Sequence, residues 1–212
     1  MRPTLYIPSF CAFLILLFSG IASSCSNDQA DAGYFSGKFR LDFATVRLQN
    51  AVPVLALDSK DTLKASSIPT FGFTKKDGQR VLVNHSPDEG KGIVIHSVSD
   101  ILTSRIFTAK LDTIPVDPVK VQSAWVGGGY LNLVLYMDYY SKKHKFGLYR
   151  SAQSPNALYL SHNKEGDSEG YPVRIYMSFL LNGLQRSAND STSFSVNIPT
   201  SSGLKIYKFT FL

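Results

Sequence analysis

Apolar residues in the first half of the chain form short runs that alternate or cluster with the two-residue period of β-strands. Asp77 and Gly78 stand between two of the runs, and an Asp-Gly pair offers the positive φ values that a tight hairpin turn demands. Several short strands without helical periodicity predict a closed or nearly closed barrel, because closure removes exposed strand edges. The runs lie at 34–43, 51–57, 70–73, 80–85 and 92–98.

The second half of the chain has a stronger β pattern. Phe194, Val196 and Ile198 alternate with polar neighbours, so their strand should bury one face only. The run YLNLVLYMDYY at 130–140 is apolar on both faces, which suits a strand covered on both sides. Glycine, asparagine and serine turns separate the runs, and the pattern predicts an antiparallel β-sandwich. The seven runs are VKVQSAWV, YLNLVLYMDYY, KFGLYRS, ALYLSHN, PVRIYMSFLL, SFSVNI and KIYKFTFL.

Two segments between these regions are less regular. Residues 99–107 fit either a short helix capped by Ser99 or a strand with alternating sides. Residues 109–118 contain two prolines, which favour an extended path. We therefore expect an all-β chain with a barrel domain at 34–110 and a β-sandwich domain at 119–212.

The N-terminus has the layout of a signal peptide, with Arg2, a dense apolar stretch at 10–18 and a small-residue exit before Cys25. The dense stretch is too short to cross a hydrocarbon core, which takes about 20 apolar residues. The exit sequence ASSC resembles a bacterial lipobox in which Ala22 replaces the usual leucine. We expect removal of a lipoprotein signal peptide, residues 1–24, and a lipid on the thiol of Cys25.

The alternative is an ordinary secretory peptide cut near Ala22 or Ser24, with Cys25 left as an unmodified thiol. Processing at either place also removes Cys11, which is the other cysteine of the chain. A secreted protein with one leftover thiol needs an explanation, and acylation supplies it. The lipid therefore remains the favoured interpretation.

Residues 25–33 are polar and acidic after the cysteine, and they should form a flexible tether between the lipid and the fold. An acidic tether resembles the surface-export signals of some Gram-negative lipoproteins. This short stretch does not decide whether the protein faces the periplasm or the cell surface. The chain has a net charge of +6. Its lysine pairs at 75–76 and 142–143 fall where turns are expected, so we expect no nucleic-acid partner.

The four histidines do not show the close spacing of a pre-formed metal site. His144 and His162 could meet across strands, and a packed or hydrogen-bonded pair is then the better interpretation. The stretch HNKEGD lacks the dense acidic alternation of a calcium loop, so it should be a structural turn. The residues of that turn are His162, Asn163, Gly166 and Asp167.

No catalytic constellation is visible in the sequence. There is no Gly-x-Ser-x-Gly elbow, and the glycines at 127–129 are followed by neither a helix pattern nor a P-loop lysine. We expect a protein that is not an enzyme, with no catalytic residue, no metal and no cofactor. Tyr139 and Tyr140 are adjacent on one strand, so one of them should point outward and could form part of a binding face.

Five pieces of the sequence occur in an order that is found in a known family. They are ASSC, KKDGQRVLVN at 75–84, AWVGGGYLNLVLYM at 124–137, KHKFGLYR at 143–150 and LYLSHNKEGD at 158–167. Together these pieces resemble the NigD-like family of Gram-negative envelope lipoproteins. The resemblance implies an OB-like N-terminal barrel and a C-terminal β-sandwich, and it supplies no catalytic residue. The family name comes from association with a bacteriocin locus, and its members are mostly described as lipoproteins of unknown role.

These observations predict a lipoprotein of the cell envelope, in the outer membrane, that acts as a binding or accessory protein. Its partner would be another envelope protein or an extracellular ligand, and the sequence leaves the oligomeric state open. An alternative is oligosaccharide binding on the face of the OB-like barrel, with nucleic-acid binding less favoured there.

Overall fold

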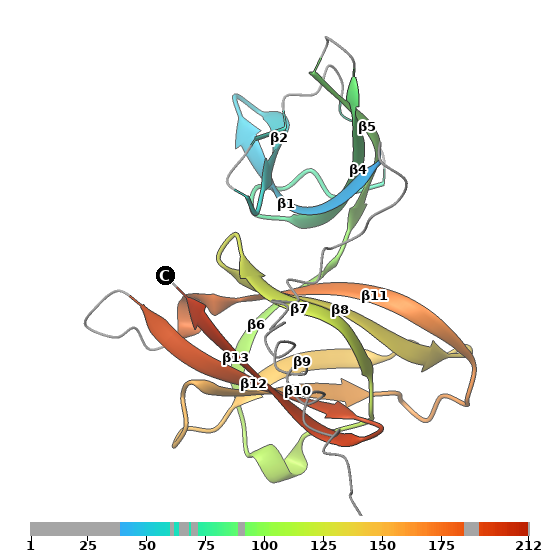
Figure 1. The fold of residues 1–212 in the computed structure, drawn as a ribbon, viewed down its shortest axis with the longest axis vertical. Coiled ribbons are helices and arrows are strands. Elements are labelled where there is room, and N and C mark those ends of the chain that lie inside the picture. Colours follow the sequence, from blue (N-terminus) through green and yellow to red (C-terminus); the bar gives the residue numbers. More distant parts are fainter. Residues whose placement is uncertain are drawn as a thin grey trace, which may run out of the picture. The chain divides into compact units, whose positions relative to one another are not determined.

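The computed structural model describes residues 39–59, 62–63, 68, 72–88, 92–184 and 191–211. The expected signal peptide, the tether and Cys25 lie outside these residues. Within the described part, β-strands make up the regular structure, apart from two short 3-10 turns at Leu111–Thr113 and Leu181–Gly183. The chain is therefore all-β, as its apolar pattern predicts (Figure 1).

The first part of the fold is a five-stranded, nearly closed barrel-like sheet with the strand order β3-β2-β1-β4-β5. Alternate residues of its strands point inward, and the resulting core includes Val46, Leu55, Val81 and Val83. All four pairings in this sheet are antiparallel. The strands are β1 (Arg40–Gln49), β2 (Val52–Leu57), β3 (Thr62–Leu63), β4 (Arg80–Asp88) and β5 (Gly92–Asp100).

The expected strand at 70–73 is wrong for its described residues. Gly72 has a φ of +91°, and a Cβ placed there would lie 2.6 Å from the carbonyl oxygen of Val98. This left-handed backbone cannot continue a strand, so residues 72–73 form a bend. The turn at Asp77 and Gly78 does form, but it closes against β1, where an Asp77 carboxylate oxygen accepts a hydrogen bond from the Leu48 amide.

The second part of the fold is an eight-stranded sheet folded into two layers around one core (Figure 1). One layer contains β11, β8 and β7, and the other contains β9, β10, β12 and β13. All seven runs predicted for this region are strands. The strands are β6 (Leu102–Thr108), β7 (Lys120–Gly127), β8 (Tyr130–Tyr139), β9 (Lys145–Arg150), β10 (Ala157–Asn163), β11 (Tyr171–Leu180), β12 (Thr192–Thr200) and β13 (Gly203–Phe211).

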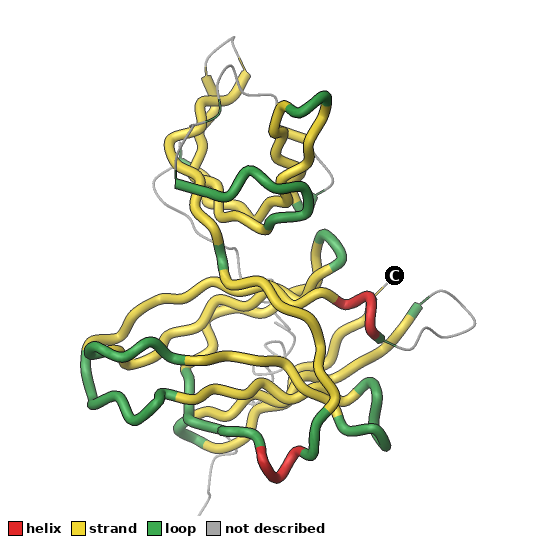
Figure 2. Tube along the Cα trace, turned by 180° about the vertical axis from the view of Figure 1, so that it is seen from behind, coloured by secondary structure: helices red, strands yellow, loops and turns green. Residues whose placement is uncertain are grey.

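Strand β6 joins the two layers, although the sequence grouped its residues with the barrel. Its first four residues pair with β11, and Ile106–Thr108 then pair with β9. Both pairings are parallel, and so is the pairing of β10 with β12, so the sandwich is mixed where the sequence predicted an antiparallel one. Local turn signals identify hairpins, whereas these parallel pairs join strands far apart in the chain. Figure 2 shows the chain running from the barrel through a short loop into β6.

A small apolar cluster lies where barrel strands meet the sandwich. Phe43 from β1 packs edge-on against Trp125 from β7, with 4.9 Å between ring centroids. Ile101 and Val134 complete the buried part of the cluster. Ile101, the single residue between β5 and β6, is thus held against the outer face of β8.

Candidate functional site

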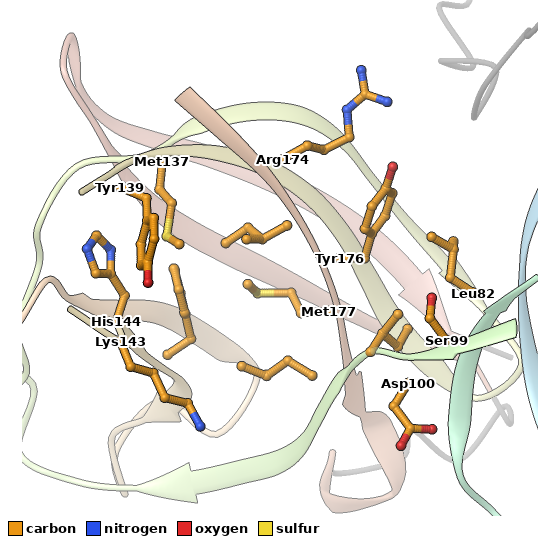
Figure 3. Close-up of a pocket in the computed structure, with 14 residues that line it drawn as sticks. Leu82, Ser99, Asp100, Met137, Tyr139, Lys143, His144, Arg174, Tyr176 and Met177 are labelled. Atoms are coloured by element: carbon orange, nitrogen blue, oxygen red, sulfur yellow. The ribbon is translucent and has the colours of Figure 1, made fainter. Parts of the chain in front are cut away.

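A cleft of about 510 Å³ opens beside β11, at the place where β6 departs toward the barrel. Its floor is apolar and includes Met137, Phe146, Ile175 and Met177, which come from both sandwich layers. We call this space the interlayer cleft. Figure 3 shows Met177 at its centre, Met137 beside Tyr139, and Arg174 on the far side from Lys143 and Asp100.

Charged and aromatic side chains form the rim of the interlayer cleft. The guanidinium of Arg174 donates to the hydroxyl oxygen of Tyr136, with an Nε to oxygen distance of 3.0 Å. Hydrogen bonds to Tyr176 and Tyr136 raise the pKa of Arg174 above its ordinary value. Asp100 accepts hydrogen bonds from the amide and hydroxyl of Thr74. Among the described residues no ion pair is formed by Lys143, so this lysine leaves a positive charge at the mouth.

Beside the cleft, a chain of hydrogen bonds connects Asp167, His144, His162 and Asp117. The Nε2 atom of His144 lies 3.2 Å from an Asp167 oxygen, and its Nδ1 atom lies 2.9 Å from Nε2 of His162. Nδ1 of His162 lies 3.1 Å from the backbone oxygen of Asp117. Both histidine side chains and Asp167 are buried.

The ends of this chain fix where each imidazole donates. Carboxylate and carbonyl oxygens only accept, so His144 donates from Nε2 and His162 donates from Nδ1. The bond between the rings needs a third proton, and two neutral imidazoles carry only two.

The surroundings of His162 and Asp167 shift the pKa values of both groups. Burial lowers the pKa of His162 below 6.5, although the Asp117 carbonyl opposes this shift. Burial raises the pKa of Asp167, but hydrogen bonds, chiefly from the backbone of Tyr140, Ser141 and Lys142, more than offset it and hold the pKa well below 3.8.

We expect the stability of the fold to decrease on acidification in two steps. The unfolded chain takes up a proton at His162 below about pH 6.5, whereas the folded chain resists it, so the first loss starts there. The second loss starts below about pH 3.8, where unfolded Asp167 becomes protonated before the folded form. Urea midpoints measured from pH 7.5 to 3 should therefore fall, and His162→Gln should flatten the upper step. A midpoint that stays constant between pH 7.5 and 5.5 would contradict this assignment.

A second polar cluster joins the barrel to the sandwich around Arg80, whose side chain is fully buried. Its guanidinium binds both oxygens of Asp58 at 2.6 and 2.8 Å and also donates to Asn132 at 2.9 Å. Thr45 and Ser178 accept the remaining hydrogen bonds. Because β1, β4, β8 and β11 all contribute, this cluster fixes the two sheets in contact.

The structure separates the two tyrosines that the sequence singled out. Tyr139 lines the interlayer cleft, whereas Tyr140 is 65% exposed. The structure also brings His144 and His162 together as a hydrogen-bonded pair. Within the described residues no group of three histidine, cysteine or acidic side chains is placed to hold a metal ion. No helix in that part of the chain is long and apolar enough to cross a membrane.

Of the predicted turn residues, His162 and Asn163 end β10, and Gly166 and Asp167 lie on the loop that follows it. Asn163 accepts a hydrogen bond from the amide of Glu165, and Gly166 has a φ of +68°. Asp167 reaches further than expected, because it binds the backbone of Tyr140 and Ser141 after β8. No sequence signal indicates this long-range role, or the closeness of the turn to the cleft.

The fold defines a class of all-β proteins in which a small barrel precedes a β-sandwich. Residues 103–211 match the family model described as the NigD-like C-terminal beta sandwich domain. The chain belongs to this NigD-like family, and the match begins within β6. No curated protein matches the chain.

Solved structures share both parts of the fold. A candidate toxin-related protein of Parabacteroides distasonis is 27% identical, with a TM-score of 0.71 over 82% of this chain and 93% of its own. A NigD-like immunity protein of Bacteroides caccae is 24% identical, with a TM-score of 0.65 over 85% and 99%. A candidate lipoprotein of Bacteroides fragilis is 11% identical, with a TM-score of 0.59 over 82% and 97%.

Proposed function

We propose that this chain is an outer-membrane lipoprotein, anchored by a lipid on Cys25, that acts as a non-enzymatic accessory protein and binds a partner in the interlayer cleft. The lipobox-like sequence supports the anchor. The solved relatives named as an immunity protein and a candidate lipoprotein fit an accessory role in the envelope.

The interlayer cleft is the observation that carries the binding proposal. Its volume lies within the range of about 300 to 1,000 Å³ that is typical of ligand sites. An apolar floor with a few polar groups on the rim is also typical of such sites. Tyr139, Tyr176 and Arg174 belong to residue types that are frequent at the centres of protein interfaces.

The state of the buried histidines favours binding without catalysis. Both ring nitrogens of His144 and of His162 are engaged in hydrogen bonds. A general base needs a free acceptor within reach of the substrate proton. We therefore assign the chain of hydrogen bonds to positioning the loops beside the cleft.

The oligosaccharide alternative has less support. Within the described residues of the barrel, Phe39 is the one aromatic side chain that is largely exposed. Phe43 is instead buried against Trp125. A continuous platform for stacking sugar rings would need more exposed aromatic residues than the described part of this face offers.

Photocrosslinking in the native host tests the binding proposal. A benzophenone amino acid in place of Lys143 should give a discrete crosslinked product, because this side chain lies on the rim. The same amino acid in place of Lys205, an exposed residue of β13, is the matched control and should give none. Equal products from both positions, or no product from Lys143, would count against the cleft as the binding site.

We expect Cys25→Ser to release the protein from the membrane. Without the thiol no diacylglycerol can be attached, and acyl chains supply about 0.8 kcal/mol of membrane affinity per buried methylene. Fractionation should move the protein from the membrane pellet to the soluble fraction, and mass spectrometry of the wild type should show a lipid on residue 25. Cys11→Ser is the control, because that cysteine lies in the expected signal peptide. A variant at position 25 that stays in the pellet would refute the anchor.

A further inference from the structure

Strand β6 lies between the two sandwich layers, but it pairs with only part of β11 and part of β9. Strand β6 pairs with β11 opposite Met177–Leu180 and with β9 opposite Leu148–Arg150. The residues that precede β6 belong to the barrel. In the described part of the chain, β11 residues 171–176 therefore have no strand partner on the side away from β8.

The interlayer cleft follows this free edge and surrounds it. Tyr176 and Arg174 lie on the face of β11 that points toward the barrel, whereas Ile175 and Met177 lie on the face that points into the sandwich. Residues of a strand alternate between two faces. An extended segment laid along β11 would place successive side chains in the two halves of the same cleft.

We propose that the free edge of β11 binds an extended polypeptide segment of a partner as an added strand of the sandwich. This inference rests on the proposed binding function and names the form of its ligand. Exposed strand edges bind peptides by backbone hydrogen bonds, and pockets for alternate side chains provide specificity. Pro172 has no amide donor, so Val173–Tyr176 would provide the pairing.

The residues that line the interlayer cleft indicate which side chains the bound segment should carry. Met137, Phe146 and Met177 call for apolar side chains at every second position. Lys143 has no described ion partner and Arg174 donates to the hydroxyl oxygen of Tyr136, while Asp100 already accepts two hydrogen bonds. The uncompensated charge is positive, so an acidic side chain should accompany the apolar ones.

A display selection provides the ligand for the test. The protein, purified as its host processes it, is screened against a library of random eight-residue peptides. We expect enriched peptides with alternating apolar residues and an acidic residue. Lys143→Glu should weaken their binding at least tenfold, whereas Lys205→Glu on β13 should leave it unchanged.

An N-methyl scan of one selected peptide tests strand pairing without altering the protein. Methylation removes one amide donor at a time, and donors of a strand face its neighbour at every second residue. We expect at least tenfold weaker binding at alternate positions and less than threefold change between them. A loss without this period, or binding insensitive to Lys143→Glu, would overturn the strand proposal.

The crosslinking experiment separates failure of this inference from failure of the proposed function. If no peptide is selected but the probe at Lys143 captures one distinct envelope protein, the binding function stands and strand addition is refuted. If the crosslink joins two copies of this chain, or returns to the same chain, the occupant is not a partner and the inference is also refuted.

Discussion

Replacement of Arg80 by methionine should lower the free energy of unfolding by about 3 to 5 kcal/mol, which is the usual cost of breaking a buried ion pair by removing one member. The guanidinium is fully buried and binds Asp58 through two hydrogen bonds. Without it, the Asp58 carboxylate stays among Asn132 and the glycines of the β7–β8 turn with its charge uncompensated. Urea denaturation followed by tryptophan fluorescence would measure the change.

Two further variants distinguish this mechanism from a general loss of charge. Arg47 pairs with Asp77 at 3.6 Å on the surface, where both side chains are more than half exposed. Arg47→Met should therefore cost less than about 1 kcal/mol. The double variant Arg80→Met with Asp58→Leu removes both buried charges and should recover part of the lost stability. Equal effects of Arg47→Met and Arg80→Met would contradict the role given to the cluster.

The strands could be predicted because their signals are local. Runs such as 130–140 and 145–150 carry their apolar pattern within a few residues, and glycine or serine turns mark their ends. Residues 99–107 stayed ambiguous because the sequence does not show what they pair with. Strand β6 is fixed by its pairing with β9 and β11, and these two strands lie roughly 40 to 80 positions further along the chain.

The candidate site was only partly predictable for the same reason. Tyr139 was singled out as an aromatic residue on a strand, but the cleft that it lines exists only after β6 and β11 come together. No sequence signal marks Arg80 as a buried side chain. Its burial depends on Asp58, Asn132 and Ser178, and no sequence spacing connects these residues. The glycines at 127–129 indicate only a turn between two strands, yet the first two pack against Asp58.

Those glycines allow the sharpest comparison in the molecule. Gly128 and Gly129 both have positive φ, at +61° and +86°, so alanine at either position should cost about 1 to 2 kcal/mol in backbone strain. Only at Gly128 does the added Cβ meet the Asp58 carboxylate, 2.3 Å from its Oδ1 atom, whereas nothing described lies within 4 Å at Gly129.

Gly128→Ala should therefore displace Asp58 from Arg80. The loss in the free energy of unfolding should approach the roughly 3 to 5 kcal/mol that a broken buried ion pair costs, about as much as for Arg80→Met. Gly129→Ala should show the backbone cost alone. The difference between their free energies of unfolding, measured under one condition, isolates the contact with Asp58. In the background of Arg80→Met and Asp58→Leu, the excess cost of Gly128→Ala should shrink, because the charge pair is already absent. Equal destabilisation by the two alanines would show that the β7–β8 turn does not hold this carboxylate in place.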